Sequence, residues 1–107
     1  MNPQDFKKIA ANFTEETITI DEPHVTIRCD ENNIKVEQVK NALLGNGPEL
    51  IRVIEDRLRV YKLYYRLSRK TELKIVVDMF AHNKINIRTL KKLSRKFTVG
   101  SVKRQRF

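Results

Sequence analysis

The run VYKLYYRLS, residues 60–68, combines residue types that bind phosphate with residue types that stack on bases. Lys62, Tyr64 and Arg66 recur at every second position, so on a β-strand their side chains point to the same side of the sheet. Ammonium and guanidinium groups engage phosphates, and an aromatic ring between them can stack on a base. The spacing therefore indicates a surface suited to a nucleic acid, although an ordinary wet face of an antiparallel sheet alternates in the same way.

Charge is distributed unevenly along the 107 residues. Residues 1–51 carry five basic and nine acidic side chains, a balance of −4. Residues 52–107 carry the other 17 basic and four acidic side chains, a balance of +13. A uniform compositional bias would not leave the first half acidic. The asymmetry therefore favours a basic surface with a polyanionic partner, RNA or DNA, over a merely solvated one.

Hydrophobic periodicity predicts two helices in the first half of the chain. The first spans residues 3–13, with Pro3 suited to its first turn. The second follows residue 34 and stops at the GNGP cluster of residues 45–48. Residues 16–20 alternate as a strand does. The HVTIR run of residues 24–28 either extends that strand or begins a helical turn, and its β-branched residues favour the strand.

From residue 49 onward the hydrophobic period is two, which predicts strands at residues 49–55, 57–68, 72–80 and 84–88. Connections as short as residues 55–56, 69–71 and 82–84 favour antiparallel neighbours in a meander. In residues 89–97, Leu90, Leu93 and Phe97 have helical spacing, which favours a short basic helix over a frayed strand end. We thus expect an α+β fold, with two helices on one face of a mainly antiparallel four- to five-stranded sheet, in the order α-β-α-β-β-β-β.

Length and composition predict a single α+β domain over residues 1–97, followed by a basic flexible tail over residues 98–107. The chain has one cysteine, no apolar run long enough to span a membrane and no apolar secretory segment at its start. We therefore expect a cytoplasmic protein with no membrane partner.

Alternation also assigns the faces of the sheet. In residues 72–80, Leu73, Ile75, Val77 and Met79 share one side, which we expect to lie beneath the helices. The opposite side carries Phe80 and only one acidic residue, Asp78. We predict that the nucleic-acid-binding residues lie on this opposite side and in the basic segment after it: Arg52, Lys62, Tyr64, Lys74, Lys91, Lys92, Arg95 and Lys96, together with Arg66 and Arg88.

Other chemistry is scarce in the sequence. It has no Gly-rich phosphate loop, no metal-binding cluster and no nucleophile motif, so we expect no metal and no small-molecule cofactor. Cys29 is better interpreted as a small buried residue than as a nucleophile. His82 falls in a predicted hairpin turn, whereas His24 lies four residues before Arg28 and is the histidine of greater interest.

The run PHVTIRCDENNIKVEQVKNALL resembles the His-x-x-x-Arg signature of BrnT-like domains, which belong to the wider RelE/ParE toxin superfamily. The matched positions are His24, Arg28, Ile34, Glu37, Val39 and Leu43, and the likeness extends over about residues 17–93 because the order of the strands downstream is similar.

The resemblance implies a compact ribonuclease that cleaves RNA through attack of a ribose 2′-hydroxyl on the neighbouring phosphate, without a metal. It would make His24 the acid or base, and Arg28, Arg66 and Arg88 the groups that stabilise the phosphate. Tyr64 would stack on a base or orient the substrate, and an acidic antitoxin-like protein would be a partner. A structural role for His24 and Arg28 is the alternative. Two functions therefore stand: a toxin-type endoribonuclease, and a non-catalytic RNA- or DNA-binding module with the same sheet face.

Overall fold

The computed structural model of the chain describes residues 1–81 and 83–94, which form three α-helices and five β-strands. Their order along the chain is α1 (Pro3–Ala10), a short 3-10 turn (Glu15–Thr17), β1 (Ile18–Ile20), α2 (His24–Glu31), α3 (Val36–Leu44), β2 (Glu49–Arg57), β3 (Val60–Arg66), β4 (Thr71–Ala81) and β5 (Lys84–Ser94). The predicted α+β class is confirmed, but there is one helix more than the sequence pattern predicts.

The five strands form one open sheet in the order β1-β5-β4-β3-β2. Strands β2 to β5 make the predicted antiparallel meander, because each is joined to the next by a short connection. The short strand β1 lies parallel to β5, where Ile18 pairs with Ile85 and Ile20 with Ile87. It leaves the edge of β5 free beyond Ile87, and that free edge becomes important for the placement of α2.

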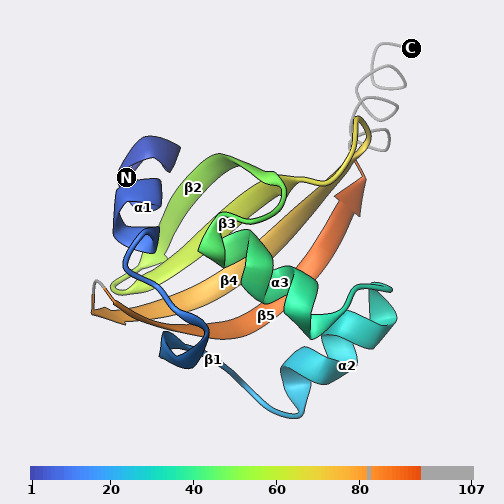
Figure 1. Ribbon diagram of the computed structural model, residues 1–107. Helices are drawn as coiled ribbons and strands as arrows, with labels where there is room; N and C mark the ends of the chain where they lie inside the picture. Colours follow the sequence, from blue (N-terminus) through green and yellow to red (C-terminus); the bar gives the residue numbers. More distant parts are fainter. Residues whose placement is uncertain (82, 95–107) are drawn as a thin grey trace.

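Helices α1 and α3 lie on one side of the sheet (Figure 1), and the hydrophobic core fills the space between them and the strands. Asn2 caps α1 by accepting a hydrogen bond from the Asp5 N–H at 2.9 Å, and α1 buries Phe6 in the core. Helix α3 buries Val39 and Leu43 and ends at Gly45, whose φ of 82° is the left-handed conformation that glycine adopts easily. Both predicted helices are therefore present, although α1 ends at Ala10, three residues before its predicted end.

The side of β4 that faces the core carries Leu73, Ile75, Val77 and Met79, as predicted from alternation. On β3, Leu63 and Tyr65 face the same side and pair with Ile75 and Leu73. Because side chains alternate along each strand, Lys62, Tyr64 and Arg66 point to the opposite side, and the assignment of the two faces is confirmed.

Residues 24–28 do not form a strand, contrary to our expectation, but begin the helix α2. Val25 and Cys29, one helical turn apart, are both buried in the core, and the Glu22 carboxylate accepts from the Thr26 hydroxyl at 2.6 Å at the start of the helix. Just beyond the end of α2, the Asn32 side-chain oxygen accepts from the Lys92 N–H at the free edge of β5, at 2.9 Å. Tertiary packing beside β5 thus overrides the strand propensity of the β-branched residues.

The first hairpin turns later than predicted. Glu55 and Asp56 belong to β2, and the turn is made by Leu58 and Arg59, with Arg59 at a φ of 67°. A break in register between Glu55 and Arg57 leaves Asp56 as an extra residue in the strand. The predicted connection is therefore part of β2, with Glu55 paired to Tyr61 and Asp56 in a β-bulge, and the strand ends two residues later, at Arg57.

Residues 89–94 are not helical, and the expectation of a basic helix is wrong for this segment, because β5 continues to Ser94. A bulge at Arg88 separates the pairs Val77–Ile87 and Val76–Thr89. It shifts the alternation by one residue, so that Ile87 and Leu90 both face the core although they are three residues apart. Leu93, the partner of Glu72, faces the other side of the sheet, so the helical spacing of Leu90 and Leu93 does not mark one buried face. Residues 95–97 and the predicted tail over residues 98–107 lie outside the described residues.

Candidate nucleic-acid interface

The side of β2–β5 that faces away from α1 and α3, here called the open face, carries the predicted cations. Arg52, Tyr64, Lys74 and Lys91 are consecutive partners on β2, β3, β4 and β5, so they form one row across the sheet. Neighbouring strands lie about 4.8 Å apart, which makes this row roughly 14 Å long. A single row thus brings three cations from distant parts of the chain to the same strip of surface.

Two aromatic side chains on the open face differ in exposure. Tyr64 is only 9% exposed, and the Arg52 guanidinium lies over its ring, 4.1 Å from the ring centre. Its ring is therefore occupied by a cation rather than free to stack on a base, and its role is to hold Arg52 in place. Phe80, which alternation along β4 places on the open face, is 57% exposed and offers the accessible ring.

The open face has more acidic residues than the sequence predicts, since Asp78 is not the only carboxylate beside the basic groups. The Arg88 guanidinium lies 3.6 Å from the Asp78 carboxylate, and the Arg52 guanidinium 3.7 Å from that of Glu72. The Lys62 ammonium lies 3.6 Å from Asp56, the residue of the β2 bulge. These partly exposed pairs contribute little stability, on the order of 0–1 kcal/mol each, but they orient the basic groups.

Three cations of the open face are free of such pairing. Among the residues that the structure describes, no carboxylate lies within ion-pair distance of Arg66, Lys74 or Lys91. Arg66 sits opposite Glu72 in the register, two residues along β3 from the row of Tyr64 and Lys74. These three groups are the ones that can bind phosphate without first losing a carboxylate partner.

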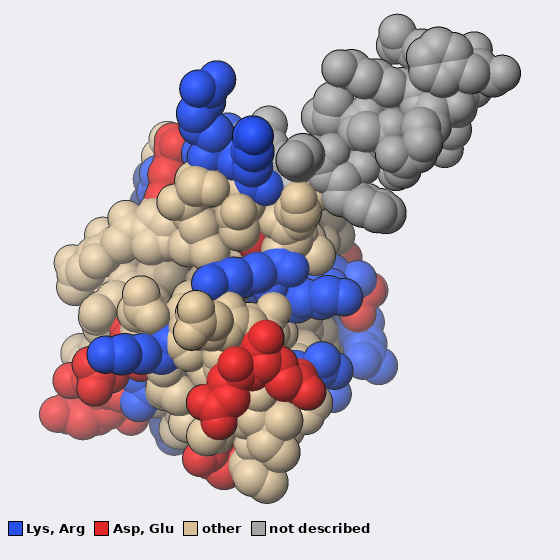
Figure 2. All heavy atoms as spheres, turned by 90° about the vertical axis from the view of Figure 1, so that its right-hand side faces the viewer, with Lys and Arg blue, Asp and Glu red and all other residues tan. Residues whose placement is uncertain are grey.

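Figure 2 shows the molecule from the side on which α2 lies in Figure 1. Lysine and arginine side chains form a band across the middle of this side, and aspartate and glutamate side chains gather below it. Charges of both signs thus share this side, with a prominent acidic group below the basic band.

At one end of the open face a shallow hollow of about 320 Å³ is lined by Asp21, His24, Arg57, Val76, Arg88 and Thr89. The His24 Nε2 atom lies 3.1 Å from the Thr89 hydroxyl oxygen, which sets the orientation of the imidazole. The Asp21 carboxylate accepts from the Asn86 side-chain amide at 2.9 Å. Two guanidinium groups and an imidazole around one hollow can hold a phosphate group and move a proton.

The hollow contains two of the four residues proposed for catalysis. His24 and Arg88 line it, because α2 begins beside β5 and the bulge at Arg88 lies there. Arg28 lies one helical turn further along α2, outside the hollow, with its guanidinium 3.4 Å from the Glu31 carboxylate. Arg66 is also outside the hollow. It lies six residues along β3 from Val60, the partner of Arg57, and six residues of a strand span about 20 Å.

Arg57 and Asp21 belong to the hollow, and the sequence pattern did not indicate either of them. Arg57 was expected at the start of the second strand of the hairpin, and only the bulge at Asp56 carries it to the end of β2. Asp21 follows directly after the strand predicted over residues 16–20. Its backbone N–H donates to the Ile87 carbonyl at 2.9 Å, which extends the contact with β5.

Of the basic residues predicted after Arg88, Lys91 lies on the open face opposite Lys74. Lys92 is the partner of Leu73 and so belongs to the core side, where its ammonium donates to the Asn33 carbonyl at 3.2 Å. It is thus not on the open face. Arg95 and Lys96 lie outside the described residues.

The remaining chemical candidates in the described part of the chain are few. Cys29 is buried, and its burial, together with the nearby Asp30 and Glu22 carboxylates, raises the pKa of the thiol, so it is a poor nucleophile. Within residues 1–81 and 83–94, no three His, Cys, Asp or Glu side chains are grouped so that they could hold a metal ion. None of the helices in these residues is long and apolar enough to cross a membrane.

Comparison with known proteins finds no matching family model, no similar curated protein and no similar solved structure. The resemblance to BrnT-like domains therefore stays a prediction from the motif, and function has to be argued from the open face and the hollow.

Proposed function

We propose that this protein binds RNA on the open face of its sheet. The observation that supports this most directly is the group of Arg66, Lys74 and Lys91 on three adjacent strands, free of carboxylate partners within the described residues. Phosphates of a single strand are spaced closely enough to engage several of these cations at once, and Phe80 supplies an exposed ring for a base. RNA is favoured over DNA because of the BrnT-like motif.

Charge-removing substitutions test this proposal. Arg66→Ala and Lys74→Ala should each weaken the binding of labelled single-stranded RNA, by roughly three- to tenfold at low salt, because each removes one phosphate contact. The matched control is Lys8→Ala, which removes an exposed cation from α1 on the helical side of the sheet. Equal weakening by all three substitutions would mean that only the net charge matters, and the proposal would then fail.

The second candidate function is cleavage of RNA at the hollow, supported by the meeting of His24, Arg57 and Arg88 there. In this reaction the 2′-oxygen of a ribose attacks the adjacent phosphorus and the 5′-oxygen of the next nucleotide leaves, which produces a 2′,3′-cyclic phosphate. His24 would transfer a proton, and the two guanidinium groups would stabilise the charge that develops on the phosphate oxygens. An acidic partner protein that covers the open face would compete with RNA for the same cations.

Incubation with labelled RNA in the presence of EDTA, followed by detection of 2′,3′-cyclic ends, tests the second function. Arg88→Ala and Arg57→Ala should lower the cleavage rate by about ten- to a thousandfold, the scale for loss of one charge-stabilising donor. Arg28→Ala should leave the rate unchanged if the hollow is the site, whereas the sequence motif predicts a loss. RNA that is bound yet remains intact over hours, with and without ribosomes, would reject cleavage and leave the binding module.

A further inference from the structure

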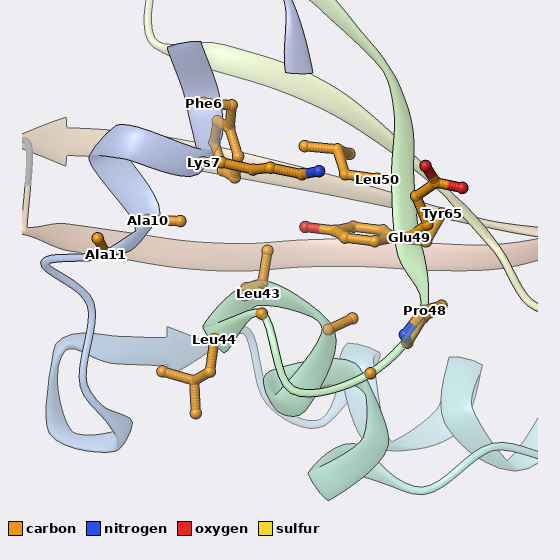
Figure 3. Close-up of a pocket in the computed structure, with 13 residues that line it drawn as sticks. Phe6, Lys7, Ala10, Ala11, Leu43, Leu44, Pro48, Glu49, Leu50 and Tyr65 are labelled. Atoms are coloured by element: carbon orange, nitrogen blue, oxygen red, sulfur yellow. The ribbon is translucent and has the colours of Figure 1, made fainter. Parts of the chain in front are cut away.

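A second concave site lies on the other side of the sheet from the open face, between α1, the end of α3 and the start of β2 (Figure 3). Its volume is about 500 Å³, within the usual range for small-molecule sites. The walls are mainly apolar, and the residues that line them include Phe6, Ala10, Leu43, Leu44, Leu50 and Tyr65. None of these residues takes part in the RNA-binding surface proposed above.

The polar group inside this pocket is the hydroxyl of Tyr65. Tyr65 is only 2% exposed, and Figure 3 shows its hydroxyl pointing into the pocket between Leu43 and the side chain of Lys7. Within the part of the chain that the structure describes, no protein group forms a hydrogen bond with this hydroxyl, and no side-chain oxygen is both buried and without a partner, so the hydroxyl is accessible from the pocket. Burial also raises the pKa of Tyr65, so the hydroxyl keeps its proton at neutral pH and can donate it in a hydrogen bond.

A second donor lies at the mouth of the pocket. Lys7 is exposed on α1, and its side chain extends across the opening toward Leu50 (Figure 3). No carboxylate of the described residues is within ion-pair distance of its ammonium group. The carboxylate of Glu49 lies on the β2 side of the rim. This group would favour a cationic ligand, whereas Lys7 would favour an anionic one.

We propose that this pocket binds a small amphipathic monocarboxylate, with its apolar chain against Phe6, Leu43 and Leu50 and its carboxylate near Tyr65 and Lys7. A phenol O–H and an ammonium group are both donors, and a carboxylate is the acceptor that satisfies both at once. The flexible stem of Lys7 lets the ammonium follow the carboxylate to the depth of the Tyr65 hydroxyl. The apolar walls select for a ligand with a hydrocarbon or aromatic body.

Binding of three probes with the same chain and different heads tests the assignment: octanoate, octylamine and octanol. Amide NMR spectra of the full chain should show octanoate shifting the signals of Tyr65 and of the loop at Gly45–Gly47. Lys7→Gln should weaken octanoate binding by about tenfold, the scale for a hydrogen bond to a charged group, and Tyr65→Phe should weaken it as well. Lys8→Gln is the matched control, since Lys8 is the next residue of α1 and does not line the pocket.

The opposite results are equally clear. Octylamine that binds as well as octanoate would assign the rim to Glu49 and overturn the proposal, and octanol that binds equally well would reduce the site to a nonspecific apolar pocket. Unchanged octanoate affinity in Lys7→Gln would also overturn it, and this exposed substitution leaves the core intact even where Tyr65→Phe does not fold. RNA binding by the open face is measured separately, so failure of one proposal leaves the other standing.

Discussion

Arg88 has no direct partner on β4, because the bulge of β5 places it between the pairs Val77–Ile87 and Val76–Thr89. The extra residue lets the side chain reach both the Asp78 carboxylate at 3.6 Å and the hollow. Bulges commonly re-aim a side chain in this way near functional sites. At the scale of single residues, the position of Arg88 is thus set by the bulge that interrupts the pairing of β5 with β4.

Tyr65 provides a prediction at the same scale, on the opposite side of the sheet. Burial raises the pKa of Tyr65, so the folded chain holds the phenolic proton more tightly than the unfolded chain does. This contribution to stability is fully present below the ordinary tyrosine pKa, about 10, and is lost as the pH rises beyond it, because the unfolded state ionises first. Urea denaturation should therefore show that Tyr65→Phe loses less stability than the wild type between about pH 9 and pH 11. An identical loss in both proteins would contradict the buried, protonated phenol.

Among the elements, β4 is the central strand of the meander, and it has one side toward the core and the other on the open face. It pairs along its length with β3 and β5, presents Ile75 and Val77 to the core and presents Lys74 and Val76 to the open face. Helix α2 has a different task, since it covers the edge of β5 that the three-residue strand β1 leaves free. The hollow exists because these two elements meet beside β5.

Neighbouring valines on β4 test this division. Val77→Ala should destabilise the protein by about 1–3 kcal/mol, because Val77 is fully buried and its loss leaves a cavity in the core. Val76→Ala removes the same methyl groups from the open face and loses the same strand propensity, so it should cost clearly less, about 0.5 kcal/mol. Thermal or denaturant unfolding of both variants measures the difference. A larger cost at Val76 would mean that the two faces are reversed.

Across the whole molecule, residues 1–48, which contain the helices, carry eight acidic and five basic side chains, whereas residues 49–94, which form β2 to β5, carry five acidic and twelve basic ones, so the charge asymmetry of the sequence becomes an asymmetry in space. Acidic residues on the open face reduce its positive electrostatic potential locally, because Glu72, Asp78 and Asp56 form ion pairs with basic side chains. What remains is a partly neutralised basic surface, which suits reversible binding to a polyanion better than permanent occupation.

Salt dependence of RNA binding is the prediction that belongs to this scale. If Arg66, Lys74 and Lys91 each neutralise one phosphate, the logarithm of the association constant should fall with the logarithm of salt concentration with a slope of about −2 to −3, and more steeply if the paired cations also take part. Arg66→Ala should reduce the magnitude of the slope by about 0.7 to 0.9, whereas Lys8→Ala should leave the slope unchanged. A slope near zero, or no binding at low salt, would contradict an electrostatic RNA surface.

The sequence alone determined the features that depend on local periodicity. Helical spacing and the stop at Gly45 located α3, and alternation located β3 and β4 and placed Lys62, Tyr64 and Arg66 on one face. These predictions succeeded because a strand or a helix sets the direction of each side chain relative to its neighbours in the chain. The α+β class and the antiparallel meander followed from the same patterns together with the short connections.

Only the tertiary structure decided which of these side chains meet. The placement of α2 depends on the free edge of β5, and the shift at Arg88 depends on pairing with β4. The contact of Arg52 with Tyr64 depends on another irregularity of β2, a register shift between Leu50 and Arg52. Each is a long-range register effect, and one inserted residue reverses the direction of every side chain that follows it until the next irregularity. For that reason the sequence identified His24 and Arg88 separately, and the fold brought them together with Arg57 around one hollow.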